Sequence, residues 1–75
     1  IPEYIKILAL ENEPKHRGNP LVYYLDWPSE ECQMAALKRN PTGKLKDVYY
    51  LFTNPSEKAT EYFFRETNKE DYETR

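Results

Sequence analysis

Two related segments occur in this sequence, and this internal repeat is the feature that most constrains the fold. Residues 22–30 read VYYLDWPSE, and residues 48–57 read VYYLFTNPSE. In each copy, an apolar and aromatic run typical of a β-strand precedes a Pro-Ser-Glu helix start. Serine can cap free backbone N–H groups there, and glutamate complements the positive end of the helix. The repeat therefore predicts two strand-to-helix units.

Further apolar runs and turn-forming residues complete the predicted order of elements. The apolar run Tyr4–Leu10 predicts a first strand, and the Pro, Gly and Asn residues of 11–20 predict a loop. Strands are expected near residues 4–10, 21–25 and 45–52, with helices near 29–39 and 54–69. A crossover helix makes the second and third strands parallel, and the short first loop places the first strand antiparallel beside the second. The predicted fold class is α+β, a small β-β-α-β-α domain whose three-stranded mixed sheet packs with two helices.

Length and cysteine content limit the organisation of the chain. The 75 residues suffice for one domain, 1–75, with a frayed tail expected at 70–75. Because the chain opens with Ile-Pro rather than Met, we expect it to be excised from a larger protein. Cys32 is the only cysteine, which excludes an internal disulfide and favours an intracellular setting, cytoplasm or nucleus. No apolar run approaches about 20 residues, so no membrane partner is expected.

Catalytic and ligand-binding patterns are weak. His16 is the only histidine and lies between Lys15 and Arg17, with no nucleophile or acid placed by the sequence to partner it. Cys32 is expected in the core, since Glu30 and Glu31 oppose formation of a thiolate there. The two glycines are isolated, so no phosphate-binding loop is present. We therefore predict a non-enzymatic protein with no catalytic residue, metal, cofactor or small-molecule substrate.

Aromatic residues predict a protein-binding function. Tyr62, Phe63 and Phe64 spread over about 200° of a helix, so one core-facing stripe cannot hold all three. Trp27 precedes the first predicted helix, where it could cover the core or protrude. We predict a protein–protein interaction module whose anchors are Trp27, Tyr62 and Phe64, because exposed rings commonly anchor protein contacts. The alternative for Phe64 is that its ring covers the rim of the sheet.

A second function is left open by the basic residues. The predicted topology brings loops 15–17 and 38–46 to one end of the molecule, although the formal net charge is −2. The cations concerned are Lys15, Arg17, Lys38, Arg39, Lys44 and Lys46. This end could bind RNA or DNA, with Tyr23 or Tyr49 stacking on exposed bases. In the competing interpretation, the helix-end cations complement the helix dipole and the others keep an edge soluble.

Overall fold

The computed structural model describes residues 2–73, with side chains for residues 2–69. Over this range all regular structure is helical and no strand occurs, so the predicted α+β fold with a mixed sheet is wrong. The elements are α1 (Glu3–Glu11), the 3₁₀ turn η1 (Leu21–Tyr24), α2 (Glu30–Arg39), α3 (Leu45–Tyr49) and α4 (Glu57–Glu73).

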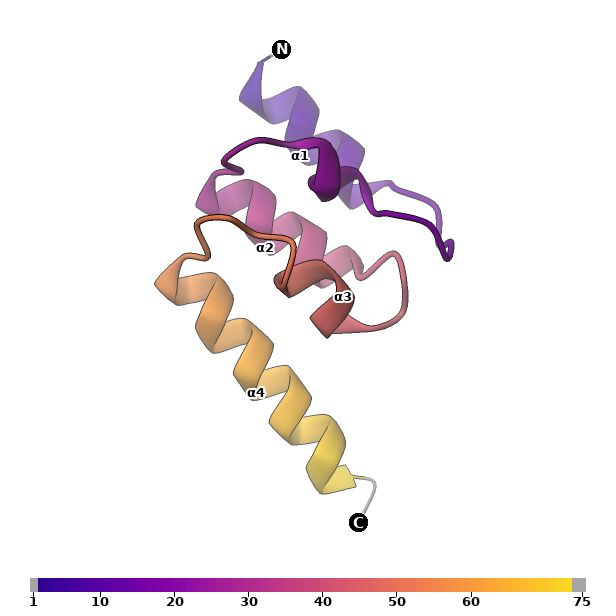
Figure 1. The fold of residues 1–75 in the computed structure, drawn as a ribbon, viewed down its shortest axis with the longest axis vertical. Helices are drawn as coiled ribbons and strands as arrows, with labels where there is room; N and C mark the ends of the chain where they lie inside the picture. The colour runs from indigo at the N-terminus through magenta and orange to yellow at the C-terminus, as the bar shows by residue number, and fades with distance from the viewer. Residues whose placement is uncertain (1, 74–75) are drawn as a thin grey trace.

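Helix α2 is the centre of the arrangement. It contacts α1, η1, α3 and α4, and α4 also packs against α3. Figure 1 shows α1 and α2 stacked at the upper end, while the second half of α4 extends beyond the other elements. The described part of the chain is accordingly elongated, with principal extents of 44 × 26 × 17 Å.

The internal repeat forms the same local structure twice, but that structure is one helical turn rather than a strand. The amide of Leu25 donates to Val22 O at 3.1 Å, and the amide of Leu51 donates to Val48 O at 3.2 Å. In both copies the valine is buried and the leucine packs against the core. Valine and leucine lie three positions apart, which is the spacing of residues on one face of a helical turn. The prediction instead assumed the two-residue alternation of a strand.

The first predicted strand is helix α1. A short apolar run does not distinguish a strand from a helix. Pro2 occupies the N-cap position of α1, where the N–H that proline lacks is not needed for a hydrogen bond within the helix. The amide of Ile5 donates to Pro2 O at 3.1 Å. At the other end, the Asn12 side chain donates to Leu8 O at 2.8 Å and closes the last turn. Of the six apolar residues of α1, only Leu10 is fully buried.

The predicted ends of α2 agree with the structure, whereas those of α4 differ by several residues. Ser29 caps α2 by accepting from Cys32 N at 3.2 Å, and Asn40 ends α2 in the left-handed conformation that this residue type tolerates. Helix α4 starts later than predicted, at Glu57, because Ser56 rather than Asn54 caps it. It also continues to Glu73, past the predicted end; the rest of the predicted frayed tail, residues 74–75, lies outside the described residues.

The core gathers apolar side chains from every element. Its buried members are Leu10, Val22, Cys32, Ala35, Ala36, Leu37, Leu45, Val48, Phe52, Ala59 and Phe63. Tyr49 stacks on Phe63 with ring centroids 4.3 Å apart. Among the described residues, no helix is both long and apolar enough to cross a membrane.

A polar side chain, Gln33, is buried beside this core. Gln33 is 1% exposed, and its amide nitrogen donates to Pro28 O at 3.0 Å and to Asn54 O at 2.8 Å. Its amide oxygen accepts from Ser56 N at 2.8 Å. Gln33 therefore connects three segments: the turn before α2, helix α2 itself and the turn before α4. We call this set of hydrogen bonds the Gln33 staple.

Replacing Gln33 by Met should destabilise the fold by about 2–4 kcal/mol, because Ser56 N, Pro28 O and Asn54 O would lose buried partners. Urea denaturation followed by circular dichroism measures this change. Lys38→Met, on the exposed side of the same helix, is the matched control and should change stability by less than about 0.5 kcal/mol. Equal midpoints for the two variants would contradict the staple.

Candidate functional site

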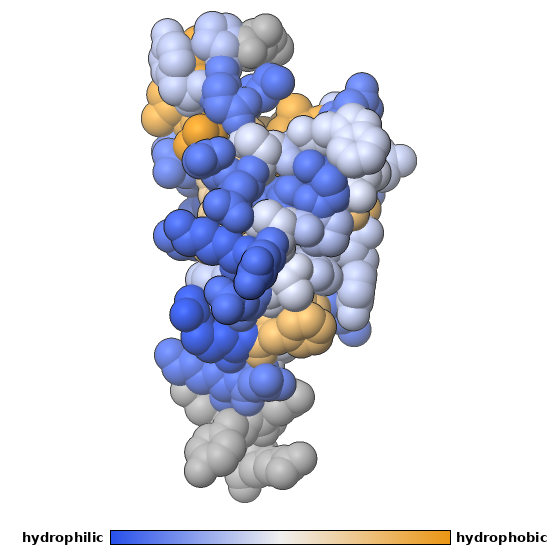
Figure 2. Space-filling view, turned by 90° about the vertical axis from the view of Figure 1, so that its left-hand side faces the viewer, coloured by the Kyte–Doolittle hydropathy of each residue, from blue (hydrophilic) through white to orange (hydrophobic). Residues whose placement is uncertain are grey.

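Large apolar side chains are exposed around α1 and η1. Figure 2 shows one side of the molecule, mostly hydrophilic, with hydrophobic side chains near the upper end, where α1 lies, and a further hydrophobic patch lower on the same side. The exposed residues of these two elements are Tyr4, Ile5, Leu8, Leu21, Tyr23 and Tyr24. These six side chains are between 41% and 68% exposed.

An apolar hollow of about 220 Å³ lies between α1 and η1. Its lining residues are Ile5, Lys6, Ala9, Leu10, Leu21, Tyr24 and Leu25. The loop after α1 turns the chain back, so η1 packs against the helix that precedes it. Lys6 is the one charged residue in this lining, and every other member except the Tyr24 hydroxyl group is apolar.

A second hollow, of about 410 Å³, adjoins the first. The two share Lys6, Tyr24 and Leu25 among their lining residues, so they form one continuous surface. The second hollow adds Glu3 from α1 and Trp27 from the turn before α2. We call the two hollows together the α1–η1 groove.

Trp27 stands beside this groove in an unusual conformation. Its backbone φ is 76°, a region that bulky residues avoid, and its side chain is 71% exposed. The Gln33 staple fixes the following residue, since Pro28 O accepts from Gln33 and also from Asn54 Nδ2 at 3.2 Å. A backbone strain of about 1–3 kcal/mol is thus maintained to present a ring that the described residues do not cover.

The polar wall of the second hollow consists of Glu3, Ser29 and Cys32. The Glu3 carboxylate accepts from the Ser29 hydroxyl group and from Cys32 Sγ, the latter at 3.4 Å. These two hydrogen bonds lower the pKa of Glu3. Burial raises the pKa of the Cys32 thiol, so the sulfur is a protonated donor rather than a nucleophile. The arrangement joins α1 to the start of α2.

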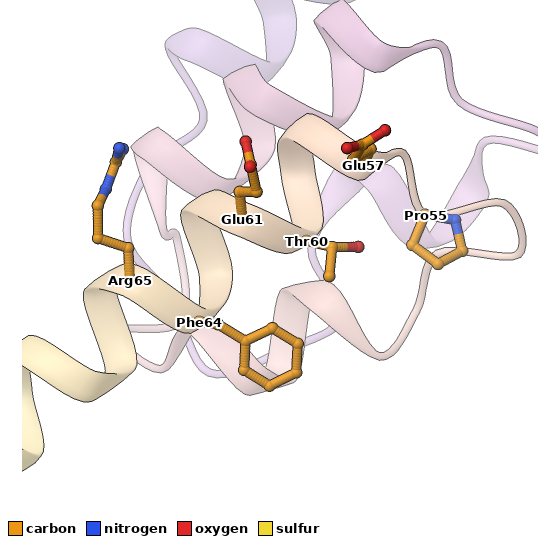
Figure 3. Close-up of a pocket in the computed structure, with 6 residues that line it drawn as sticks. All are labelled: Pro55, Glu57, Thr60, Glu61, Phe64 and Arg65. Carbon is orange, nitrogen blue, oxygen red and sulfur yellow. The ribbon is translucent and has the colours of Figure 1, made fainter.

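The other two predicted anchors lie on α4, in a different place. Phe64 lines an open hollow with Pro55, Thr60, Arg65 and two glutamates, and Figure 3 shows its ring on the same side of α4 as Thr60. Phe64 is 53% exposed, and the rest of its surface is covered in part by Phe63, whose ring centroid lies 5.3 Å from that of Phe64. Tyr62 is half-buried beneath Arg65, and burial raises its pKa. The hollow that Trp27 lines contains neither of these α4 residues.

The basic loops do meet, although the sheet that was to bring them together is absent. Lys15 Nζ donates to Arg39 O and Asn40 O at 2.8 Å each, and the amide of His16 donates to Pro41 O at 2.9 Å. Arg39 Nε donates to Glu13 O at 2.6 Å. Lys15 and Arg39 therefore hold the two loops together.

The remaining predicted cations and rings separate into different places. Arg17 and Lys46 line one hollow, whereas Lys38 lies beside Glu11, Glu30 and Glu31. Lys44 is exposed at the start of α3. Tyr49 cannot stack on a base because its ring lies against Phe63, and Tyr23 contacts Tyr24 instead.

Sequence reasoning missed Ile5, Lys6, Leu21 and Tyr24, because it placed them on two strands of a sheet, where the groove between α1 and η1 does not exist. The repeat holds a usable signal. In a helical turn with valine and leucine inward, the last tyrosine of each copy points outward, and both Tyr24 and Tyr50 are indeed exposed.

Comparison with known proteins adds no relative, since neither a family model nor a curated protein nor a solved structure matches the chain. Across the described residues, no cluster of three or more His, Cys, Asp or Glu side chains could hold a metal ion.

The Glu3 contacts predict a defined pH dependence. A lowered pKa means that Glu3 stabilises the fold above its ordinary pKa of 4.5 and loses this contribution as the pH falls through the lowered value. Glu3→Gln should therefore be less stable than the parent at neutral pH, and the difference should shrink in acid. Thermal melts across this pH range measure it, with Glu11→Gln as the control. A difference that grows in acid would contradict the assignment.

Proposed function

We propose that this chain is a non-enzymatic protein-interaction module that binds a partner segment in the α1–η1 groove. The observation that carries the proposal is Trp27, which is held exposed at a positive φ beside an apolar hollow. Strained residues cluster at binding and switch sites, and tryptophan and tyrosine are the residues most often found as anchors of protein interfaces.

The groove has the anatomy of an interface core. Ile5, Leu21 and Leu25 supply apolar surface, while Tyr24 and Trp27 supply large rings with polar tips. Water must cover this surface in the free chain, and a partner that displaces it gains about 25 cal/mol for each Å² of apolar area buried. So many large exposed apolar residues on neighbouring elements are unusual for a domain without a partner.

The lining also defines the partner. Lys6 borders both hollows and is the only cation in either lining, whereas Glu3 and Asp26 contribute two carboxylates to the second hollow. Because the lining therefore holds more negative than positive charge, a segment with apolar side chains for the first hollow and a basic side chain facing the carboxylates fits this surface best. Such a charge pair at the rim would set the orientation of the partner more than its affinity.

Two further features support the rest of the proposal. The Cys32 thiol is buried with a raised pKa, and His16 is engaged by Glu13 at 2.5 Å, so neither offers a reactive group at the groove. We place the module inside the cell, because a free, reduced cysteine suits a reducing compartment. The α4 hollow is the weaker docking surface, since the Phe64 ring is partly packed against its neighbours.

Trp27→Gly should abolish partner binding without unfolding the chain. Glycine adopts a positive φ freely, so relief of strain offsets the greater freedom of the unfolded chain and stability should stay within about 1 kcal/mol of the parent. The probe is a phage-displayed random peptide library selected on the parent chain, with binding of the enriched peptides then measured for Trp27→Gly and for Phe64→Ala.

The proposal expects enriched peptides that combine apolar residues with a basic one, bind Phe64→Ala like the parent, and lose at least tenfold in affinity for Trp27→Gly. Peptides that bind Trp27→Gly as tightly as the parent but bind Phe64→Ala weakly would place the site on α4 instead. Concentration-dependent dimerisation of the parent, abolished by Trp27→Gly, would make a second copy the occupant and overturn the partner stated here.

A further inference from the structure

The two loops that Lys15 and Arg39 hold together form a third surface, separate from the α1–η1 groove. Glu13 is buried beneath it, where its carboxylate accepts from Leu21 N at 3.0 Å and from His16 Nε2 at 2.5 Å. Pro20 and Pro41 are buried as well. These contacts fix the backbone of loop 12–20 against the loop between α2 and α3.

A hollow of about 380 Å³ opens between the fixed loops and α3. Its lining residues are Arg17, Gly18, Asn19, Pro20, Thr42, Lys46, Asp47, Tyr50 and Leu51. Arg17 comes from the loop after α1 and Lys46 from α3. Neither has an ion-pair partner among the described side chains. Two cations and one acid, Asp47, therefore line the same concave site.

Tyr50 supplies an aromatic surface at the same place. It is 73% exposed, yet its ring is supported from within, since it lies edge-on to Tyr49 at 5.7 Å and to Phe63 at 5.8 Å. Both supporting rings belong to or border the core. An exposed ring with a fixed orientation is suited to stacking, because little conformational freedom is lost when a flat group lies on it.

We propose that this hollow binds single-stranded nucleic acid, with Arg17 and Lys46 contacting phosphates and Tyr50 stacking on a base. Cations that follow a backbone, combined with an aromatic platform, are the two parts of most single-strand binding sites. Asp47 repels phosphate but can accept a hydrogen bond from the amino group of a base. Its presence favours a nucleotide over a simple polyanion.

This site differs from the basic end expected from sequence. Lys15 and Arg39 donate to backbone carbonyls, and Lys38 lies among acids elsewhere on α2. The stacking residue is Tyr50 rather than Tyr23 or Tyr49. The hollow shares no lining residue with the α1–η1 groove, so the two proposals stand or fall separately.

Fluorescence anisotropy with labelled single-stranded RNA and DNA of mixed sequence, about 10 nucleotides long, tests the proposal. Two phosphate contacts predict that affinity falls about sevenfold between about 50 and 200 mM salt. Arg17→Ala or Lys46→Ala should reduce this fall to about threefold, because one contact remains. Lys58→Ala changes the net charge equally on α4 and should keep the sevenfold dependence.

Tyr50→Leu should weaken binding at least about fivefold, whereas Tyr4→Leu, which alters an equally exposed ring on α1, should not. Absence of binding at low salt would overturn the proposal, and so would equal effects of the two tyrosine variants. Binding of poly-glutamate as tightly as the oligonucleotides would reduce the site to a general polyanion surface. Trp27→Gly should bind the oligonucleotides normally, which separates this result from that of the groove.

Discussion

The structure depends on a buried glutamine. Gln33 is the central polar group of the central helix, and its amide forms hydrogen bonds with three backbone groups inside the molecule: Pro28 O, Asn54 O and Ser56 N. Helices α1, α2 and α3 are short, and helices of this length are marginal in water without tertiary contacts. The staple sets where α4 starts and how the turn before α2 lies, so the packing of the apolar side chains follows a frame that polar contacts define.

A second set of polar contacts, around Glu13, does the same for the other end of α2. Glu13, Lys15 and Arg39 fix the long loop after α1, which has no regular structure of its own up to η1. Both exposed surfaces arise where these two sets of contacts fix a turn: Trp27 next to the Gln33 staple, and Tyr50 beside the Glu13 loop. The Trp27 ring is presented to solvent by a strained backbone, whereas the Tyr50 ring rests edge-on against Tyr49 and Phe63 and is exposed on its other sides.

How far the sequence predicts this fold depends on which signal is used. Ser29 is a local N-cap signal, and Pro41 disfavours helix in the residue before it, so local sequence located both ends of α2. The apolar runs around Tyr4, Tyr23 and Tyr49 carry no such local signal. Their inward-facing residues, such as Val22 and Leu25, are set by packing of each run against the rest of the chain. The two VYYL copies do form similar local structures, as the repeat predicts. The predicted strand alternation is wrong, because in both copies the inward-facing residues follow a helical spacing. Of the predicted anchors, Trp27 adjoins the groove, but its partner residues come from elements assigned to a sheet.

Native-state hydrogen exchange of the Ser56 amide tests the central role of Gln33 most directly. Ser56 precedes α4, and a backbone N–H at the start of a helix normally exchanges quickly because it has no partner within the helix. Its hydrogen bond to buried Gln33 predicts protection equal to that of the core amides of α2, with Glu57 and Lys58 exchanging fast beside it. Exchange of Ser56 as fast as its two neighbours would contradict the account.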